Sequence, residues 1–492
     1  MNRANKSTFP RALGVVSAML LASGCMVGPN YQRPKAPVPA AFKEPPPEGW
    51  KEAQPNDAVL RGQWWELYND PQLNALEQQV SISNQNVLAA EAQFRAARAA
   101  VRVARAGLFP TVSVAPSVIT TRTPSQVTGT VQGGTAAKPR GFYSLPIEAS
   151  YTADLWGSIR RTVAASTANA QVSAADLENA KLTYQSELAS DYFQLHGLDG
   201  DAELLDSAVK SYAEFLQLTR NRYAGGVASL GDVAQAETQL ETTRAQLVDI
   251  GVQRAQFEHA IAILIGKSPA ELSIPAATLK TPPPVIPLSL PSALLERRPD
   301  IAASERQVAA ANEQIGIAKA AFYPTLSISA SAGLESADFL KWFTWPSRFW
   351  SVGPQLAETL FDAGRRHAQV AQIEASYDAT VSNYRQTVLT AFQQVEDNLS
   401  ALRVLAEEAQ VQERAVRASR QSLTISTDQY KGGIVSYLQV ITAQTAALQD
   451  ERSAIDILTR RMTASVLLIE ALGGGWNASD LPKPAEIVTA GR

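Results

Sequence analysis

The sequence predicts a membrane protein of the α+β class that is internally duplicated, each half combining strands of bilayer length with very long helices. Landmark motifs recur once and in the same order, and the second copy follows the first at an almost constant spacing. Each half contains two runs of about ten residues in which apolar and polar side chains alternate, the length of a tilted strand that crosses a bilayer. The proline-free stretches 157–267 and 363–475 carry apolar residues at helical spacing.

The composition argues against several functional classes. With 18% charged residues and a net charge of -3, the chain lacks a basic nucleic-acid-binding domain, and no nucleic-acid partner is expected. The three histidines, His196, His259 and His367, are expected far apart on helical surfaces, without the spacing of metal ligands. There is no P-loop, dinucleotide fingerprint or nucleophile elbow. The sequence therefore predicts no enzyme, no metal and no cofactor beyond a covalent lipid.

The N-terminus is typical of a signal peptide over residues 1–24. A basic start precedes the apolar run 12–21, which is too short to span a membrane. Small residues then lead into Cys25, the only cysteine, in a pattern that resembles a bacterial lipobox despite Ala22 at the position where Leu is commonest. Cleavage before Cys25 and its acylation are expected, with Met26 giving no signal for retention in the inner membrane. The alternative is an ordinary cleavage site beside a chance cysteine.

Two proline-rich segments divide the mature chain. Residues 25–60 are predicted to form the lipid anchor and an extended tether. Residues 268–291 are predicted to connect a first structural repeat at 61–267 to a second at 292–475, and 476–492 form a C-terminal tail.

Paired motifs carry the duplication. An offset above 200 in residue number is too long for a solenoid repeat, so the pairs indicate a duplicated domain. The pairs are Phe109-Pro110-Thr111 with Tyr323-Pro324-Thr325 at an offset of 214, Leu155-Trp156 with Leu360-Phe361 at 205, and Tyr223-x-Gly225-Gly226 with Tyr430-x-Gly432-Gly433 at 207.

The alternating runs predict strands at about 111–121 and 142–155, and again at about 323–335 and 349–361. The last run is the weakest, because Glu358 falls on its apolar side. A soluble pair of hairpins with an aromatic core is the alternative. An aromatic girdle at the level of the lipid headgroups is predicted from Trp342, Phe343, Trp345, Phe349 and Trp350.

Helices that start near Gly157 and Ala363 and run to the two Gly-Gly turns would each be roughly 100 Å long and pair as antiparallel coiled coils. An ordinary soluble bundle needs no such length. The four strands of one chain cannot close a barrel, and an open sheet edge in lipid leaves backbone groups without partners. Since the smallest closed barrels have eight strands, the chain is expected to oligomerise, which would arrange the helices as a tube.

The lipobox followed by Gly28-Pro29-Asn30-Tyr31, the paired motifs and the junction Phe361-Asp362-x-Gly364-Arg365-Arg366 resemble the TolC-like outer-membrane factors over nearly the whole mature chain. The closest resemblance is to the lipoprotein branch paired with resistance-nodulation-division pumps, the NodT-type efflux lipoproteins. The resemblance implies a homotrimeric channel-tunnel with a twelve-stranded β-barrel, four strands per chain, and a long periplasmic α-helical barrel of coiled-coil hairpins.

The resemblance also implies a function. The chain would be the outer-membrane exit duct of a tripartite efflux system, lipid-anchored and membrane-spanning, passively conducting substrates from an inner-membrane pump through a periplasmic adaptor protein. The alternatives are the outer-membrane component of a type I secretion system and a non-conducting coiled-coil structural lipoprotein. The cargo and the partner pump are not encoded in these motifs.

The two Gly-Gly turns are the predicted adaptor-docking tips. Their glycines let the backbone reverse, which helix termination alone would also require. The flanking residues are small or apolar and exposed if the tip is free, which suits a docking surface. The predicted docking residues are Tyr223, Gly225, Gly226, Val227, Ser229, Leu230, Tyr430, Gly432, Gly433, Ile434, Ser436 and Tyr437.

Family members often narrow the entrance with acidic residues just after the second tip. In this sequence those positions hold Gln439 and Thr442, so that feature is missing. Asp232 and Asp428 are the other candidates for a ring of charge that would favour cations. The commoner role for such carboxylates is that of a solvated surface group.

Overall fold

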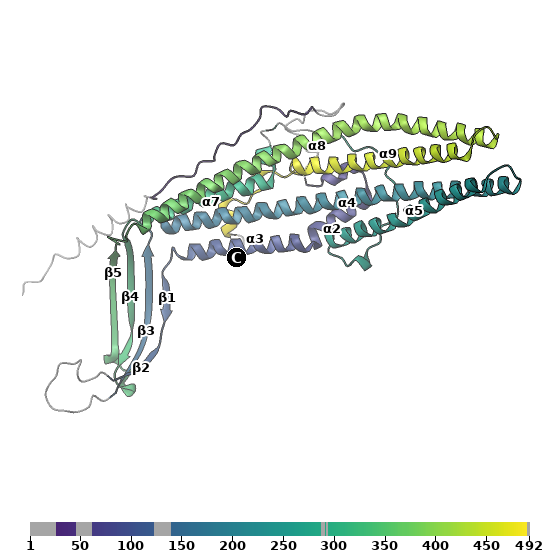
Figure 1. Cartoon of the computed structure of the whole chain (residues 1–492). Helices are drawn as coiled ribbons and strands as arrows, with labels where there is room; N and C mark the ends of the chain where they lie inside the picture. The colour runs from purple at the N-terminus through teal and green to yellow at the C-terminus, as the bar shows by residue number, and fades with distance from the viewer. Residues whose placement is uncertain (1–25, 46–61, 123–138, 287–290, 292–293, 490–492) are drawn as a thin grey trace, which may run out of the picture.

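The computed structural model describes residues 26–45, 62–122, 139–286, 291 and 294–489. The predicted signal peptide, Cys25 and the later part of the tether lie outside these residues. The molecule is an elongated helical body with a β-sheet at one end and two helical turns at the other (Figure 1).

Two long helical hairpins form most of the body. The first consists of α4 (Ser158–Ala224) and α5 (Leu230–Leu264), and the second of α8 (Arg365–Lys431) and α9 (Tyr437–Ala471). Helices α4 and α8 have 67 residues each, which corresponds to about 100 Å. Both helices of the second hairpin begin and end at an offset of 207 from their counterparts in the first (365 − 158 and 437 − 230), so the duplication preserves the helical geometry position for position.

Shorter helices pack along the half of this body nearer the sheet. Helix α3 (Gln85–Ala106) and its counterpart α7 (Pro299–Ala320) both contact α4, and α7 also contacts α8. Their offset is 214 (299 − 85), which exceeds the helical-hairpin offset by seven, so the repeats differ in length between these helices and the hairpins. The remaining short elements are η3 (Trp64–Tyr68), α2 (Pro71–Ser83), η4 (Pro269–Glu271), α6 (Leu294–Arg297), η6 (Phe339–Lys341), η7 (Trp345–Ser347), η8 (Ala478–Asp480) and α10 (Pro484–Thr489).

The strand-to-helix junctions are built alike. Gly157 and Gly364 precede α4 and α8 with φ of 81° and 85°, a conformation that glycine adopts without strain. Asp154 accepts hydrogen bonds from two backbone amides and from Arg160, and Asp362 does the same with Arg366 as its partner. The two glycines are offset by 207 (364 − 157), so the offset of 205 expected at this junction is wrong by two positions.

The strands form one antiparallel sheet. Strands β1 (Thr111–Val114) and β2 (Ser117–Thr121) pair with β3 (Arg140–Ala153), which pairs with β4 (Thr325–Ser336), which pairs with β5 (Arg348–Ala357). The run expected at 111–121 is interrupted between β1 and β2, where Pro116 has no amide to donate to the ladder. The run expected at 349–361 ends at Ala357, which places Glu358 outside the sheet and removes the misplaced charge.

The hydrophobic core lies where the two hairpins, α2 and α7 meet, in the middle of the body. Fully buried aromatic residues from three separate elements, Trp64, Tyr192 and Tyr384, contribute to it. Among the helices of the described ranges, none combines the length and the apolar character needed to cross a membrane.

Candidate functional sites at the sheet and the helical tips

The register of the sheet gathers apolar side chains on one exposed face. Val114 lies opposite Ile147, and further across the sheet Ala332 lies between Ile147 and Trp350. Trp350 is 75% exposed, so this face has no covering layer among the described residues of the chain. The large exposed residues of the face are Val112, Val114, Ile147, Ile328, Trp350, Val352 and Leu356.

The opposite face of the same sheet is polar over most of its length, although Ile119, Phe142 and Phe349 lie on it near the hairpin loops. One row across the strands consists of Ser113, Glu148, Ser331 and Ser351. Strands with one apolar and one polar face are typical of transmembrane barrels, whose outer surface meets lipid and whose inner surface meets water. Neither outer edge of the sheet carries another strand among the described residues. The sheet is therefore suited to join other sheets edge to edge.

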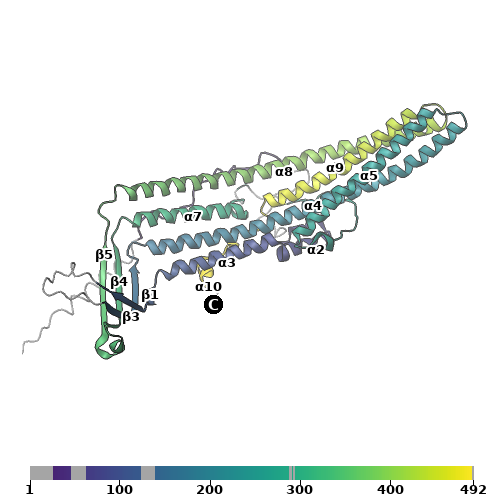
Figure 2. The same ribbon diagram turned by 60° about the horizontal axis from the view of Figure 1, so that its bottom comes forward.

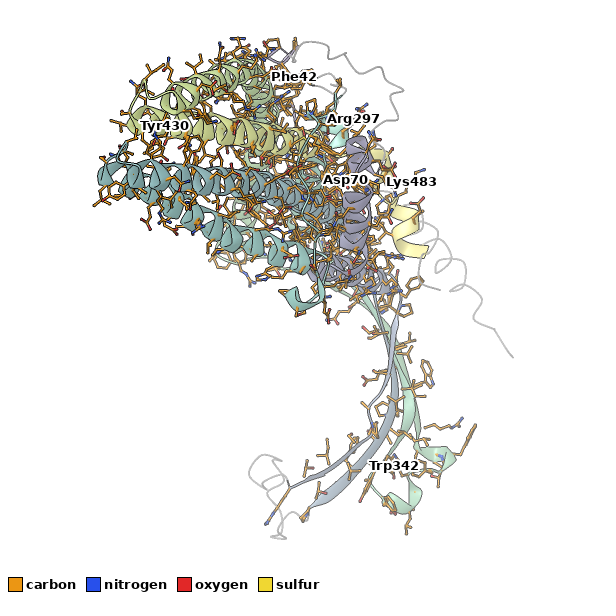
Figure 3. All side chains as sticks on the ribbon, turned by 90° about the vertical axis from the view of Figure 1, so that its right-hand side faces the viewer. Phe42, Asp70, Arg297, Trp342, Tyr430 and Lys483 are labelled. Carbon is orange, nitrogen blue, oxygen red and sulfur yellow. The ribbon has the colours of Figure 1, made fainter. Side chains whose placement is uncertain are left out.

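The predicted girdle residues lie at the end of the sheet far from the helices, where Figure 3 labels Trp342. Phe343, Trp345 and Trp350 are exposed, and Phe349 is half-buried. Trp342 is 8% exposed, because its ring packs against Tyr143 and its Nε1 donates to the carbonyl oxygen of Leu334 at 3.2 Å. Trp342 therefore packs within the hairpin loop and stabilises it, unlike the three exposed aromatic residues.

The two Gly-Gly turns lie at the opposite end of the body (Figures 1 and 2). Gly226 and Gly433 have φ of 75° and 74°, and the amide of each donates to the carbonyl of the tyrosine three positions earlier. The next amide, of Val227 or Ile434, reaches back to the last helical turn at 2.8 and 2.9 Å. Both helices therefore end in the same glycine-terminated turn.

Large apolar side chains are exposed around both turns. The exposed fractions are 47% for Tyr223, 68% for Val227, 64% for Leu230, 76% for Ile434 and 57% for Leu438. Leu438 was not among the predicted docking residues, although an apolar residue directly after Tyr437 was a visible signal. Free apolar side chains at the end of a body of this length favour contact with a partner.

Two of the predicted docking residues are not exposed. Tyr430 and Tyr437 are 3% and 1% exposed, because their rings pack against each other and into a cluster between the two hairpins. The expectation that Tyr437 is free at the tip is therefore wrong. The other members of the cluster are Tyr212, Leu216, Val233, Ala236, Leu240 and Val440.

Polar contacts reinforce this cluster from the first hairpin. The Arg222 guanidinium donates to the carbonyl oxygen of Tyr430 at 2.7 Å and lies 4.6 Å from the centre of the Tyr430 ring. Thr219 Oγ1 lies 3.3 Å from the Tyr430 hydroxyl. Sequence reasoning missed Arg222 and Thr219, since an arginine on a long helix is usually a solvated residue.

The candidate entrance residues differ in their surroundings. Asp232 accepts a hydrogen bond from the Ser229 amide at 3.0 Å, and Ser229 Oγ accepts one from the Asp232 amide at 3.1 Å. This reciprocal capping box begins α5. Asp428, Gln439 and Thr442 are exposed near the second tip.

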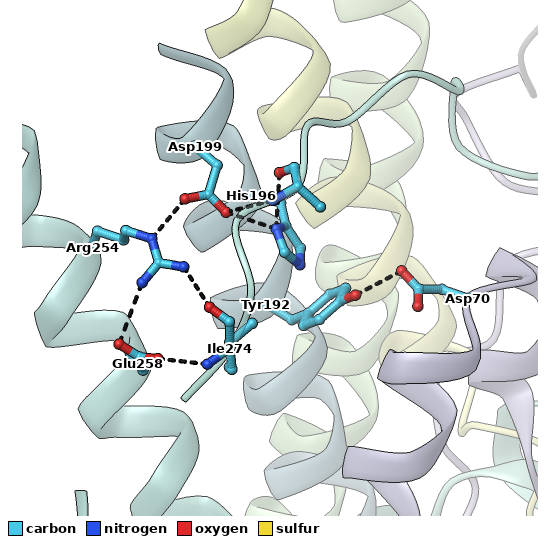
Figure 4. A network of polar contacts seen from close by, with 8 residues as sticks. Asp70, Tyr192, His196, Asp199, Arg254, Glu258 and Ile274 are labelled. Carbon is cyan, nitrogen blue, oxygen red and sulfur yellow. Dashed lines mark hydrogen bonds and ion pairs between the residues drawn. The ribbon is translucent and has the colours of Figure 1, made fainter. Parts of the chain in front are cut away.

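His196 is buried, which corrects the expectation of a surface histidine. It is 2% exposed, and its Nδ1 lies 3.0 Å from Asp199 Oδ2 and 2.9 Å from the carbonyl oxygen of Ala277 (Figure 4). Burial opposes ionisation of Asp199, but hydrogen bonds from His196, Arg254 and the Ala277 amide lower its pKa. Arg254 also donates to the carbonyl of Ile274 at 2.7 Å, so the network binds the inter-repeat connection to α4 and α5.

Neither this network nor another group of three or more acidic, histidine or cysteine side chains within the described ranges has a metal-binding arrangement. His259 and His367 are exposed and lie on other helices. The network is a structural clamp on residues 274–277.

Comparison with known proteins identifies relatives of this chain. The model of the outer membrane efflux protein family matches residues 76–267 and 290–474, once in each repeat. A probable efflux pump outer membrane protein of Pseudomonas putida, TtgC, is 32% identical over 464 residues, covering 94% of both chains. The outer membrane protein OprJ of Pseudomonas aeruginosa is 30% identical and covers 94% of this chain and 96% of its own.

Solved structures agree. The outer-membrane channel OprN matches with a TM-score of 0.82 and 28% identity, over 92% of this chain and all of its own. The CmeC channel of Campylobacter jejuni shares the fold with a TM-score of 0.84 over 94% of this chain and 97% of its own, at 22% identity. These matches confirm the predicted family, the fold class of a helical tunnel joined to a barrel, and the outer-membrane location. The chain belongs to the outer membrane efflux protein family.

Proposed function

We propose that this chain is the outer-membrane exit duct of a tripartite efflux system, conducting substrates passively after an inner-membrane pump has delivered them through a periplasmic adaptor. The observation that carries the proposal is the sheet with one apolar and one polar exposed face, since a water-filled pore in lipid needs both. The names of the relatives, which are outer membrane proteins of efflux pumps, support the same function.

The same sheet supports a homotrimer. Three copies of a four-stranded sheet, counting β1 and β2 as one, would close a twelve-stranded barrel and leave no backbone edge in the lipid. The helical hairpins of three copies would surround a common axis as a periplasmic tube. Mass measurement of the detergent-solubilised protein tests the stoichiometry; a stable monomer or dimer would contradict it.

Conductance separates this function from the alternatives. A duct is expected to make planar bilayers permeable to ions, whereas a structural coiled-coil lipoprotein leaves them sealed. Cross-linking from the tips in whole cells, followed by identification of the trapped adaptor, separates efflux from type I secretion. We propose no enzymatic activity, since the chain offers a passage and a docking surface.

The tips are proposed to dock the adaptor. Ser229→Asp tests this sharply, because aspartate caps a helix as well as serine does while adding a charge to the docking surface. We expect export to fall by at least about tenfold, the equivalent of about 1.4 kcal/mol of docking free energy, with trimer formation unchanged. Ser229→Asn, which keeps the cap without the charge, is the matched control. Normal export with Ser229→Asp would contradict docking at this tip.

Asp232 and Asp428 are the proposed entrance charges, with Gln439 and Thr442 as neutral neighbours. The capping role of Asp232 makes Asp428 the more available charge, because its carboxylate is exposed. Single-channel recordings of Asp428→Asn are expected to show reduced preference for cations. Unaltered selectivity in both Asp428→Asn and Asp232→Asn would exclude an acidic ring.

Cys25 is proposed to carry the lipid anchor, and the chain to lie in the outer membrane with this anchor and its sheet. The motif around Cys25 supports the assignment. Metabolic labelling with an alkyne fatty acid tests it, and Cys25→Ser should lose the label.

A further inference from the structure

Residues 26–31, here called the N-terminal segment, lie at the junction where the sheet joins the helices. From there the chain continues along the helical body as residues 32–45 (Figure 1). The Val27 amide donates to the carbonyl oxygen of Trp156 at 3.1 Å, directly before α4. The Trp156 Nε1 in turn donates to the carbonyl of Pro324 at 2.7 Å. The segment is therefore bound at the junction between the sheet and the helices, where both repeats contribute residues.

A buried arginine holds the segment in place. Arg161 of α4 is 1% exposed, and its Nε donates to the carbonyl oxygen of Val27 at 2.6 Å. Its Nη1 lies 2.7 Å from Glu313 Oε2 of α7, which balances the buried positive charge. A charge buried to this degree is costly unless it is paired, so an arginine at this position needs both partners.

Glycines make room for this contact on three different elements. A Cβ on Gly28, whose φ is +104°, would lie 2.5 Å from the Cα of Gly316 in α7. A Cβ on Gly316 would overlap the Arg161 side chain, and one on Gly157 would lie 2.7 Å from Met26 Cγ. The close approach therefore depends on the absence of side chains on both the segment and the body.

Two more contacts continue the attachment along α7. Asn312 Nδ2 donates to the carbonyl oxygen of Pro29 at 3.2 Å, and the Tyr31 hydroxyl donates to Glu305. Arg306 pairs with the same carboxylate at 2.5 Å. The segment thus bridges α4 of the first repeat and α7 of the second.

We infer that Arg161, Glu313 and Gly316 form an anchor clamp that holds Val27 and Gly28 at the strand–helix junction, so that the lipid on Cys25 is attached only two residues from a fixed point of the body. The inference rests on the proposed acylation of Cys25. Two trans peptide units separate Cys25 from Val27, so their Cα atoms are at most about 7.6 Å apart. The length of the tether after residue 31 has no influence on the anchor, because the clamp holds the chain before that point.

Spin-label distances test the clamp. Asn30 and Ala375 are exposed and accept cysteines in the full acylated chain, in which Cys25 is blocked by lipid. Oligomers formed with a large excess of unlabelled chain contain one labelled copy. We expect a narrow distance distribution if the clamp holds the segment. A free six-residue chain would instead spread over about 13 Å.

Gly316→Ala should displace Arg161 and broaden this distribution, though to a smaller width than that of a free chain, because the contacts of Pro29 and Tyr31 with α7 remain. Gly251→Ala is the matched control, because its new Cβ meets no atom within 4 Å and the site is also helical. A broad distribution in the unmodified chain, or an unchanged one in Gly316→Ala, would overturn the clamp.

Insertions test the effect on the anchor without touching the body. Eight Gly/Ser residues between Met26 and Val27 lengthen the link from lipid to clamp from about two residues to about ten. Effective concentration falls as about the -3/2 power of linker length, so the rate of insertion into vesicles of outer-membrane lipid should drop about tenfold. Ion leakage from the vesicles measures that rate.

The same insertion between Ala40 and Ala41, which lies after the clamp, should change the rate by less than about twofold. Equal effects of the two insertions would overturn the inference. Fatty-acid labelling of each variant separates failure of the proposed acylation from failure of the clamp. If Cys25 carries no label, the proposed lipid anchor is wrong, and the distance measurement still tests the clamp.

Discussion

The two tips of the molecule have the same backbone conformation but differ in the burial of their side chains. Tyr223 and Leu230 of the first tip are 47% and 64% exposed. Their counterparts in the second repeat, Tyr430 and Tyr437, are 3% and 1% exposed. At these two matched positions the first repeat therefore exposes its large side chains and the second buries them against the other hairpin, although Ile434 and Leu438 of the second tip remain exposed.

The helix caps differ in the same way. Ser229 and Asp232 form a closed capping box at the start of α5, whereas Ser436 makes no side-chain cap at the start of α9. The first tip is thus stabilised by its own local hydrogen bonds. The second tip is stabilised by contacts with the first hairpin, both in the apolar cluster and with Arg222. The two copies thus keep the same turn but stabilise it in different ways.

The largest effect is expected from removing the buried ring. Tyr430→Ala leaves a cavity in the cluster between the hairpins and should cost about 3–4 kcal/mol of local stability. Tyr223→Ala, at the matching exposed position, should stay within about 0.5 kcal/mol. Hydrogen exchange of the α8–α9 turn measures the first effect, and hydrogen exchange of the α4–α5 turn measures the second. Similar losses for the two variants would break the contrast between the tips.

Removing the arginine is expected to have a smaller effect. Arg222→Ala removes a charged hydrogen bond and a cation–ring contact, together worth about 2 kcal/mol. The second hairpin should then separate more readily from the first, which would appear as a wider, noisier open channel in planar bilayers. Arg220→Ala, which breaks an exposed pair with Glu237, is the control and should leave the conductance unchanged.

The smallest effect concerns the caps. Ser229→Ala should cost about 1 kcal/mol, because the Asp232 amide loses its side-chain acceptor. Ser436→Ala should cost only a few tenths of that amount, since no cap is lost. Thermal unfolding of the two variants measures both costs. An equal shift of the unfolding temperature would show that Ser436 caps α9 in the assembled protein.

Much of this fold is predictable because it follows from periodicity and from residues with special backbones. The proline-free stretches predicted very long helices, and the structure has two of 67 residues each within its described ranges. The Gly-Gly turns, the strands of the alternating runs and the family were also predictable from the sequence. The interruption at Pro116 could also have been foreseen, because proline cannot donate within a ladder.

The contacts between distant segments were not predictable. Tyr223 and Tyr430 occupy the same motif, so nothing local distinguishes an exposed ring from a buried one. The difference arises from side chains of the first hairpin, among them Tyr212, Leu216 and Arg222, which lie far from Tyr430 in the chain and beside it in the fold. His196 was misplaced for the same reason, since its partner Ala277 belongs to the inter-repeat connection.

The seam between β3 and β4 links the repeats more firmly than the chain between them does. Its ladder runs without interruption from Tyr143 opposite Ser336 to Ala153 opposite Leu326. A polypeptide cut within residues 268–291 would still hold its halves together through this ladder and through α4 against α7. We therefore expect the two halves, produced as separate chains, to reassemble into one subunit through these contacts.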